Sequence, residues 1–244
     1  MSVAVKRISD VIEALADAPQ GATSLEVASR LRMGRQAAAR LLDAMVANGM
    51  ADKDLASRRY LLGLHVYRWG SAAAARFVPP IFLRYEVAEL AEDVQHPVFY
   101  AVLDGGDVVT IERTQRRGRQ TLTIPDFRRN PWHATSSGRV LAAFSPPSQL
   151  RELLRQAGVP ALKAIDEDLD AIKREGFAAS EAVRGDGYTL AAPVLDESGQ
   201  ATAAIGIGVN KQVAEERVLI TRKLLDTAGR VSSNAGYGAM LLNA

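Results

Sequence analysis

The chain has 244 residues, of which 48% are hydrophobic and 24% are charged, a composition typical of a folded globular protein with one or two domains. It contains no cysteine, which excludes disulfides, thiolate-bound zinc and iron–sulfur clusters. No stretch approaches the ~20 apolar residues of a membrane span, and the N-terminus lacks a secretory signal, so we expect a cytoplasmic protein without membrane contact.

Positive charge is concentrated near the N-terminus. The whole chain carries a formal net charge of +2. Residues 1–70 contain ten Lys and Arg against seven Asp and Glu, a net charge of +3, and the remainder contains twenty against twenty-one, a net charge of −1. A basic head on a near-neutral body weakly indicates nucleic-acid binding, because phosphate is attracted to such a surface.

Apolar residues near the N-terminus recur with a helical period and predict three helices. The first covers residues 5–18, and the second covers residues 24–31. Thr23 or Ser24 is expected to cap the second helix, because a hydroxyl there accepts a hydrogen bond from a first-turn amide. The third helix follows a short turn with Gly34 and ends at Asn48–Gly49, and its expected buried face consists of Ala38, Leu41, Leu42, Met45 and Val46. Two helices joined in this way predict a helix-turn-helix.

The third helix begins with polar side chains, which suits a helix whose first turn enters a DNA groove. Arg35, Gln36 and Arg40 are expected to reach base edges in the major groove. Arginine pairs two-pronged with guanine, glutamine pairs with adenine, and Ala37 can rest against a thymine methyl group. A predicted β-hairpin, or wing, follows, and its Arg58 and Arg59 can contact phosphate. The alternative is a helical bundle with a solvated charged face.

Six motifs in this order resemble the IclR family of bacterial transcriptional regulators: TSLEVASRL, RQAAARLLDAMVANGM, RRYLLGLHVYRWG, PWHATSSGRVLAA, GYTLAAPVLDESG and ATAAIGIGVN. The resemblance implies an α/β (α+β) protein. It places a winged helix-turn-helix in residues 1–63, a linker helix in 64–78 and a GAF-like effector-binding domain in 79–244. It also implies a double-stranded DNA operator, a small organic acid effector, and a homodimer or dimer of dimers without a cofactor.

One departure from the family pattern concerns phosphate anchoring. Family recognition helices often begin with a Lys/Arg-Ser-Thr run, whereas here Arg35-Gln36-Ala37 has no hydroxyl. Phosphate contacts are therefore expected from the preceding helix start and from the wing, at Thr23, Ser24, Arg58 and Arg59.

The body of the chain mixes helical and strand patterns. Asp104-Gly105-Gly106-Asp107 is a strong hairpin signal. We expect helices at 64–75, 81–94, 137–144, 149–156, 166–175 and 213–242, and strands at 98–103, 108–113, 119–124, 177–183, 187–195 and 201–208.

The body shows no pattern of catalytic or metal-binding residues. His65, His96 and His133 are widely separated, without paired ligand spacing. Ser136 and Ser137 do not lie in a G-x-S-x-G elbow, and helix capping explains their hydroxyls better than catalysis does. P-loop and dinucleotide fingerprints are missing as well. We therefore predict a protein that is not an enzyme and binds no metal.

The resemblance assigns an effector pocket to residues of the body. It places Leu122, Asn130, Trp132 and Thr189 in the pocket lining, with Arg119 near the mouth to grip a carboxylate through two hydrogen bonds. Gly206 and Gly208 lie inside a strand, where glycine leaves room for a group that approaches closely. We expect them to form the floor of a pocket widened for a bulky, aromatic effector. The alternatives place Trp132 in the core, Arg119 in a solvated basic loop and the glycines at bulges.

The expected mechanism is linkage, in which the effector favours one arrangement of the dimer and so changes the spacing of the two heads. One rival is a ligand-binding metabolic enzyme whose basic head is a protein-interaction module, which predicts turnover of a small molecule. A second rival is an architectural DNA binder without an effector, which predicts a filled core and no pocket behind Thr189.

Overall fold

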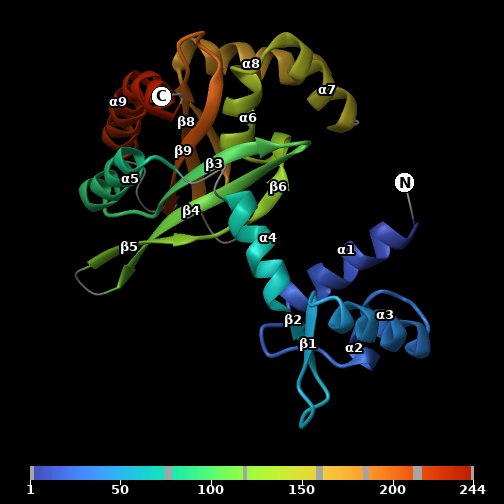
Figure 1. Cartoon of the computed structure of the whole chain (residues 1–244). Helices are drawn as coiled ribbons and strands as arrows, with labels where there is room; N and C mark the ends of the chain where they lie inside the picture. The colour runs from blue at the N-terminus through green and yellow to red at the C-terminus, as the bar shows by residue number, and fades with distance from the viewer. Residues whose placement is uncertain are drawn as a thin grey trace. The chain divides into compact units, whose positions relative to one another are not determined.

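The computed structural model describes residues 3–74, 79–117, 120–157, 162–183, 187–210 and 216–242. The chain divides into two compact units, Met1–Val78 and Pro79–Ala244 (Figure 1). Among the described residues, no helix is both long enough and apolar enough to cross a bilayer.

The N-terminal unit contains the three helices and the hairpin that the sequence predicts. Its elements are α1 (Val3–Ala16), α2 (Ser24–Arg30), α3 (Arg35–Ala47), β1 (Ala51–Lys53), β2 (Tyr60–Leu62) and α4 (Leu64–Ala74). The strands β1 and β2 pair antiparallel and form the wing. The expected linker helix over 64–78 corresponds to α4, and residues 75–78 lie outside the described residues.

One small core holds the N-terminal unit together. Apolar side chains from α1, α2, α3 and the wing meet there, among them Val11, Leu15, Val27, Leu42, Met45 and Tyr60. Leu41 and Val46 are only partly buried, so the buried face of α3 is narrower than predicted. Gly49 adopts a left-handed φ of 69° after α3, as the Asn-Gly pair predicts for a helix end.

The C-terminal unit is built on a seven-stranded antiparallel sheet in the order β5-β4-β3-β9-β8-β7, with β6 paired to β4. The strands are β3 (Val98–Asp104), β4 (Asp107–Arg117), β5 (Gln120–Pro125), β6 (Arg129–Pro131), β7 (Ala178–Glu181), β8 (Gly187–Leu195) and β9 (Ala201–Asn210). The helices are α5 (Ile81–Val94), α6 (Ser136–Ala143), α7 (Pro147–Ala157), α8 (Leu162–Glu175) and α9 (Arg217–Leu242), with a 3₁₀ turn, η1 (Trp132–Ala134), before α6.

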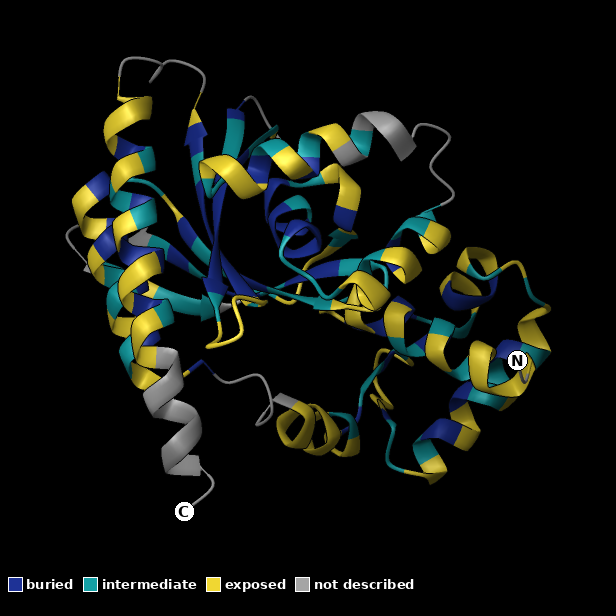
Figure 2. Cartoon of the chain, turned by 90° about the horizontal axis from the view of Figure 1, so that it is seen from above, coloured by how far each residue is buried: buried dark blue, intermediate teal, exposed yellow. Residues whose placement is uncertain are grey.

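Helices cover both faces of this sheet, which gives the GAF-like layered architecture (Figure 1). Alternate residues of β9 point to opposite faces. Ile205 and Ile207 pack in the cluster formed with α5 and α9, whereas Ala204 packs in the cluster that contains α6. Figure 2 shows the middle of the sheet as buried and the outer sides of the helices as exposed.

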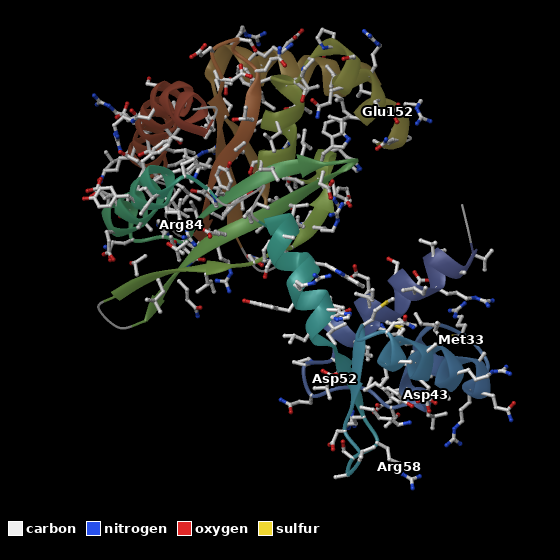
Figure 3. All side chains as sticks on the ribbon, in the orientation of Figure 1. Met33, Asp43, Asp52, Arg58, Arg84 and Glu152 are labelled. Atoms are coloured by element: carbon white, nitrogen blue, oxygen red, sulfur yellow. The ribbon has the colours of Figure 1, made fainter. Side chains whose placement is uncertain are left out.

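Polar contacts fix α5 on the sheet. Arg84 Nε donates a hydrogen bond to Glu112 Oε2 at 2.9 Å, which joins α5 to β4, and Figure 3 shows Arg84 on this helix. This hydrogen bond holds the pKa of Arg84 above its usual value. Because the pair is partly buried and charge-assisted, we expect it to orient α5 more firmly than a surface ion pair would.

Candidate functional site

The start of α3 is an exposed, electropositive helix terminus. Its N-cap, Gly34, has no side chain to form a capping hydrogen bond with the first-turn amides. Arg35, Gln36 and Arg40 are exposed there, and Ala37 is half-buried. Helix N-termini attract anions through such amides and the helix dipole. Although Arg35-Gln36-Ala37 has no hydroxyl, the backbone amides of this turn can therefore still bind phosphate.

The cations of the head differ in whether they have an acidic partner. Four ion pairs among the described residues of the head use Lys6, Arg30, Lys53 and Arg59 as cations. Within that part of the chain, Arg35, Arg40 and Arg58 are not paired with an acidic side chain. Arg58 lies near the tip of the wing with a left-handed φ of 55° (Figure 3).

The start of α2 is closed by a capping box rather than open to phosphate. The Thr23 hydroxyl accepts from the Glu26 amide at 3.3 Å, and Glu26 Oε2 accepts from the Thr23 amide at 2.7 Å. The Thr23 hydroxyl also donates to Glu26 at 3.0 Å. These bonds, above all that from the Thr23 amide, hold the pKa of Glu26 below its usual value. The capping role of Thr23 is thus confirmed. Because the Thr23 hydroxyl is already hydrogen-bonded to Glu26, we expect Ser24 rather than Thr23 to offer a hydroxyl to phosphate.

Arg59, which was also expected to contact phosphate, is hydrogen-bonded within the protein. Its Nη1 donates to the Gly21 carbonyl at 2.6 Å, and both terminal nitrogens lie 3.3 Å from the Glu26 carboxylate. Arg59 therefore ties the wing to the start of α2, and its neighbour Arg58 is the wing arginine that faces solvent.

A second contact, which the sequence did not reveal, ties the wing to α3. The Tyr60 hydroxyl donates to Asp43 Oδ1 at 2.8 Å, and Lys53 Nζ donates to the same oxygen at 2.9 Å. Lys53 also lies over the Tyr60 ring, 4.8 Å from its centroid. The bonds from Lys53 and then Tyr60 hold the pKa of Asp43 below its usual value. Figure 3 shows Asp43 on α3.

The C-terminal unit contains a cavity of about 230 Å³ at the start of α6. Its apolar wall is formed by Phe99, Ala101, Val108, Ala182 and Val183. Its polar wall includes Arg128, Arg129, Asn130, Thr135, Ser137 and Thr189. The lining therefore offers both apolar surface and polar groups to a ligand.

Hydroxyl groups at the polar wall form a connected cluster. The Ser136 amide donates to Ser180 Oγ at 2.8 Å, and Thr189 Oγ1 lies 2.8 Å from Ser136 Oγ and 3.0 Å from Ser180 Oγ. Three hydroxyl hydrogens serve these two hydroxyl–hydroxyl bonds, so one hydrogen is left over. If both serines donate to Thr189, which lines the cavity, its own hydrogen can point toward a ligand.

Two arginines at the cavity were missed, although they directly precede Asn130 in the run DFRRNP. Arg128 Nε donates to Asp126 at 2.7 Å, and Arg129 Nη1 donates to Asp104 at 2.7 Å. These bonds raise the pKa of both arginines above the usual value, so both remain charged. Both arginines line the cavity as members of ion pairs. Arg119, which was expected to grip a carboxylate there, lies outside the described part of the chain.

Of the other expected lining residues, the structure brings only Asn130 and Thr189 to the cavity. Trp132 is 1% exposed, and its indole donates to the Leu153 carbonyl at 3.2 Å, so it belongs to the core beneath α6 and α7. Leu122 is 38% exposed on β5. The Trp132 correction arises because a partner in a distant segment, Leu153, decides where its side chain points.

The two glycines of β9 contribute differently from what was expected. A Cβ atom added to Gly206 would lie 2.2 Å from Cζ of Phe99, so this glycine makes room for the aromatic ring that forms the cavity wall. Gly208 pairs with Thr189, and a Cβ atom there would meet nothing within 4 Å. The floor is therefore Phe99 resting on Gly206, rather than the glycine itself.

Metal chemistry finds no support in this geometry. Over the described residues, no three His, Asp or Glu side chains converge to hold an ion. The cavity itself contradicts the architectural alternative, which required a filled core behind Thr189.

Comparison with known proteins decides the family. A family model described as the bacterial transcriptional regulator IclR C-terminal domain matches residues 82–233. This chain belongs to the IclR family. The transcriptional regulator BhcR of Paracoccus denitrificans is 27% identical over 213 residues, which cover 84% of this chain and 76% of that protein. Such relatives are DNA-binding transcriptional regulators, which confirms that the chain is a regulator and not an enzyme.

Solved structures share the fold over nearly the whole chain. Thermotoga maritima IclR matches with a TM-score of 0.69 at 19% identity and covers 96% of this chain and 98% of its own. An IclR homolog from Microbacterium hydrocarbonoxydans, complexed with 4-hydroxybenzoate, matches with a TM-score of 0.71 at 22% identity and covers 95% and 98%. These likenesses confirm the winged helix-turn-helix and GAF-like fold.

Proposed function

We propose that this IclR-family regulator binds a specific operator and that a small aromatic carboxylic acid in the α6 cavity switches its DNA affinity. The observation that carries the proposal is the cavity, whose lining combines apolar side chains with hydroxyls, an amide and two arginines. Aliphatic organic acids are the competing effector class.

Cavity size favours an aromatic ring. A cavity of roughly 150 Å³ is enough to hold benzene, and this one measures about 230 Å³. The excess volume suits one carboxylate. The ring would lie against Phe99, and the carboxylate would accept hydrogen bonds from the hydroxyl groups of Thr189 and Ser137, which both line the cavity. The 4-hydroxybenzoate bound by the Microbacterium homolog has this combination of groups.

In the head, Arg35, Gln36 and Arg40 of α3 would contact base edges in the major groove. Ala37 would lie against a thymine methyl group. Arg58, Ser24 and the free amides at the start of α3 would contact phosphate, which positions the protein without selecting a sequence.

Exposed apolar side chains on α4 support a homodimer, alone or paired into a tetramer. Leu64 and Tyr67 are each 74% exposed, and none of residues 64–73 is buried. Apolar side chains this exposed mark an interaction surface. A second copy of α4 would cover them and would carry a second head, in the cytoplasm, to a second half-site.

Ligand titration with a matched pair of variants tests the effector proposal. Isothermal titration of 4-hydroxybenzoate, benzoate and succinate should show that the aromatic acids bind most tightly. Thr189→Val should weaken that binding about tenfold or more, as expected for a lost hydrogen bond to a charged group. Thr202→Val is the control, because it makes the same substitution at a threonine whose hydroxyl donates to the Val194 carbonyl and does not line the cavity. Equal binding by both variants, or binding of succinate alone, would contradict the proposed ligand class.

A further inference from the structure

The start of α4 is hydrogen-bonded to the end of the recognition helix α3. His65 Nδ1 donates to the Asn48 carbonyl at 2.9 Å, and the His65 amide lies 3.2 Å from the Gly49 carbonyl. The Gly63 amide donates to the Met50 carbonyl at 2.9 Å. Carbonyl groups at or just after the C-terminal end of α3 thus accept hydrogen bonds from groups at or just before the N-terminal end of α4. This satisfies groups that helix ends leave unpaired, and the two helix dipoles meet with opposite ends.

Two glycines allow this close approach. Gly49 has a φ of 69°, and a Cβ atom on it would lie 2.7 Å from His65 Nδ1. Gly63 is buried, and a Cβ atom on it would lie 2.4 Å from the Gly49 carbonyl oxygen. Any side chain at either position would force the two helix ends apart. We call the group Asn48, Gly49, Met50, Gly63 and His65 the α3–α4 joint.

Beyond its first turn, α4 has little else to hold it to the head. None of residues 64–73 is buried, and the His65 ring lies against Trp69 of the next turn with 6.1 Å between ring centroids. His65, in the first turn of α4, therefore contacts Trp69 in the next turn of the same helix and Asn48, the C-cap of α3. This places His65 where it can fix the direction of one helix relative to the other.

We infer that His65 is a positioning residue that makes α3 and α4 move as one body, so that the placement of α4 sets the orientation of the recognition helix. This inference rests on the proposed dimer, in which two α4 helices carry two heads. A rigid joint makes the distance between the two recognition helices sharply defined. A loosened joint lets each head adjust to its half-site independently.

Operator spacing tests the inference without an effector. A duplex selected from a random pool by the wild-type protein supplies the half-site, which is then placed at the selected spacing and at spacings one base pair longer and shorter. Each added base pair rotates one half-site by about a tenth of a turn. We expect each change to weaken wild-type binding by about tenfold or more, because a rigid pair of heads cannot follow.

His65→Ala should reduce that spacing penalty to about threefold or less, while affinity for an isolated half-site stays within about twofold. His65→Gln retains a side-chain donor and should restore part of the penalty. His133→Ala, an exposed histidine of the other unit, is the matched control and should behave as wild type. A full spacing penalty in His65→Ala would overturn the inference. Failure of the wild type to select any sequence would instead overturn the proposed DNA function.

Discussion

Arg35 and Arg58 are both exposed arginines of the head, yet they are expected to contact different parts of DNA. Arg35 begins the recognition helix, and Arg58 lies at the wing. Arg35→Ala should cost about 1–3 kcal/mol on the preferred sequence and relax specificity at one base pair. Arg58→Ala should weaken all sequences alike and lower the slope of binding against salt by about one. Binding titrations on matched and single-base-changed duplexes distinguish the two, and identical profiles would contradict the assignment.

Glu26 gives the head a predictable acid response. Its pKa is lowered in the folded state, chiefly by the Thr23 amide, so its stabilising effect is present above the ordinary pKa near 4.5. That effect is lost as pH falls through the lowered pKa, because the protonated carboxyl no longer favours the fold. Glu26→Gln should therefore lower the melting temperature at about pH 7 and match wild type in strong acid. An equal difference at both pH values would show that the carboxylate charge is irrelevant.

Individual residues were predictable from sequence where a local pattern decides their role. A cap at Thr23 or Ser24 was predictable because a hydroxyl before a helix accepts a hydrogen bond from a first-turn amide. The structure selects Thr23 and adds Glu26 to form a capping box. Trp132 was wrongly expected in the cavity, because its partner, Leu153, lies in a distant segment. The contact of Arg59 with Glu26 was likewise not visible in any local pattern. Phe99 lines the cavity because Gly206 of another strand admits its ring, and no pattern near Phe99 signals this.

Helices and long strands were predictable because their apolar residues repeat with a fixed period. The strand β9 alternates between two buried faces, and the helices of the head show one apolar side. The strand β6 and the turn η1 were missed, since three residues show no period. Unlike β1 and β2, which pair as a hairpin, β6 pairs with a strand that is not its neighbour in the chain. These two elements carry Asn130 and lead into α6, so the part of the fold that builds the cavity is the part with the weakest sequence signal.

Two neighbouring glycines of β9 provide a matched test of how that strand shapes the cavity. In Gly206→Ala the new Cβ atom meets the Phe99 ring, so we expect a destabilisation of about 1–3 kcal/mol, as for overpacking of a core. The displaced ring should also weaken effector binding. In Gly208→Ala the Cβ atom enters open space. That variant should be as stable as wild type or more stable by about 0.4–1 kcal/mol, because alanine loses less backbone freedom on folding.

Denaturant unfolding and ligand titration of the two variants give both readouts. Equal stability of Gly206→Ala and Gly208→Ala would contradict the claim that the Phe99 ring packs directly on Gly206.

Under the proposed function, the whole molecule combines two units whose activities would be coupled through linkage. An effector can change DNA affinity only by as much as it prefers one arrangement of the dimer over another. The α3–α4 joint places the recognition helix under the control of α4, the helix that is expected to contact a second copy. Whether the effector weakens or strengthens DNA binding depends on which arrangement it favours.

The most direct test is a mobility shift of the purified protein on the DNA upstream of its own gene, competed with random DNA across a salt series, with and without 4-hydroxybenzoate. We predict a retarded band that resists the competitor, weakens steeply with salt and changes in intensity with the acid. Equal competition by random DNA at every salt concentration, or a specific band that no aromatic acid alters, would contradict the account.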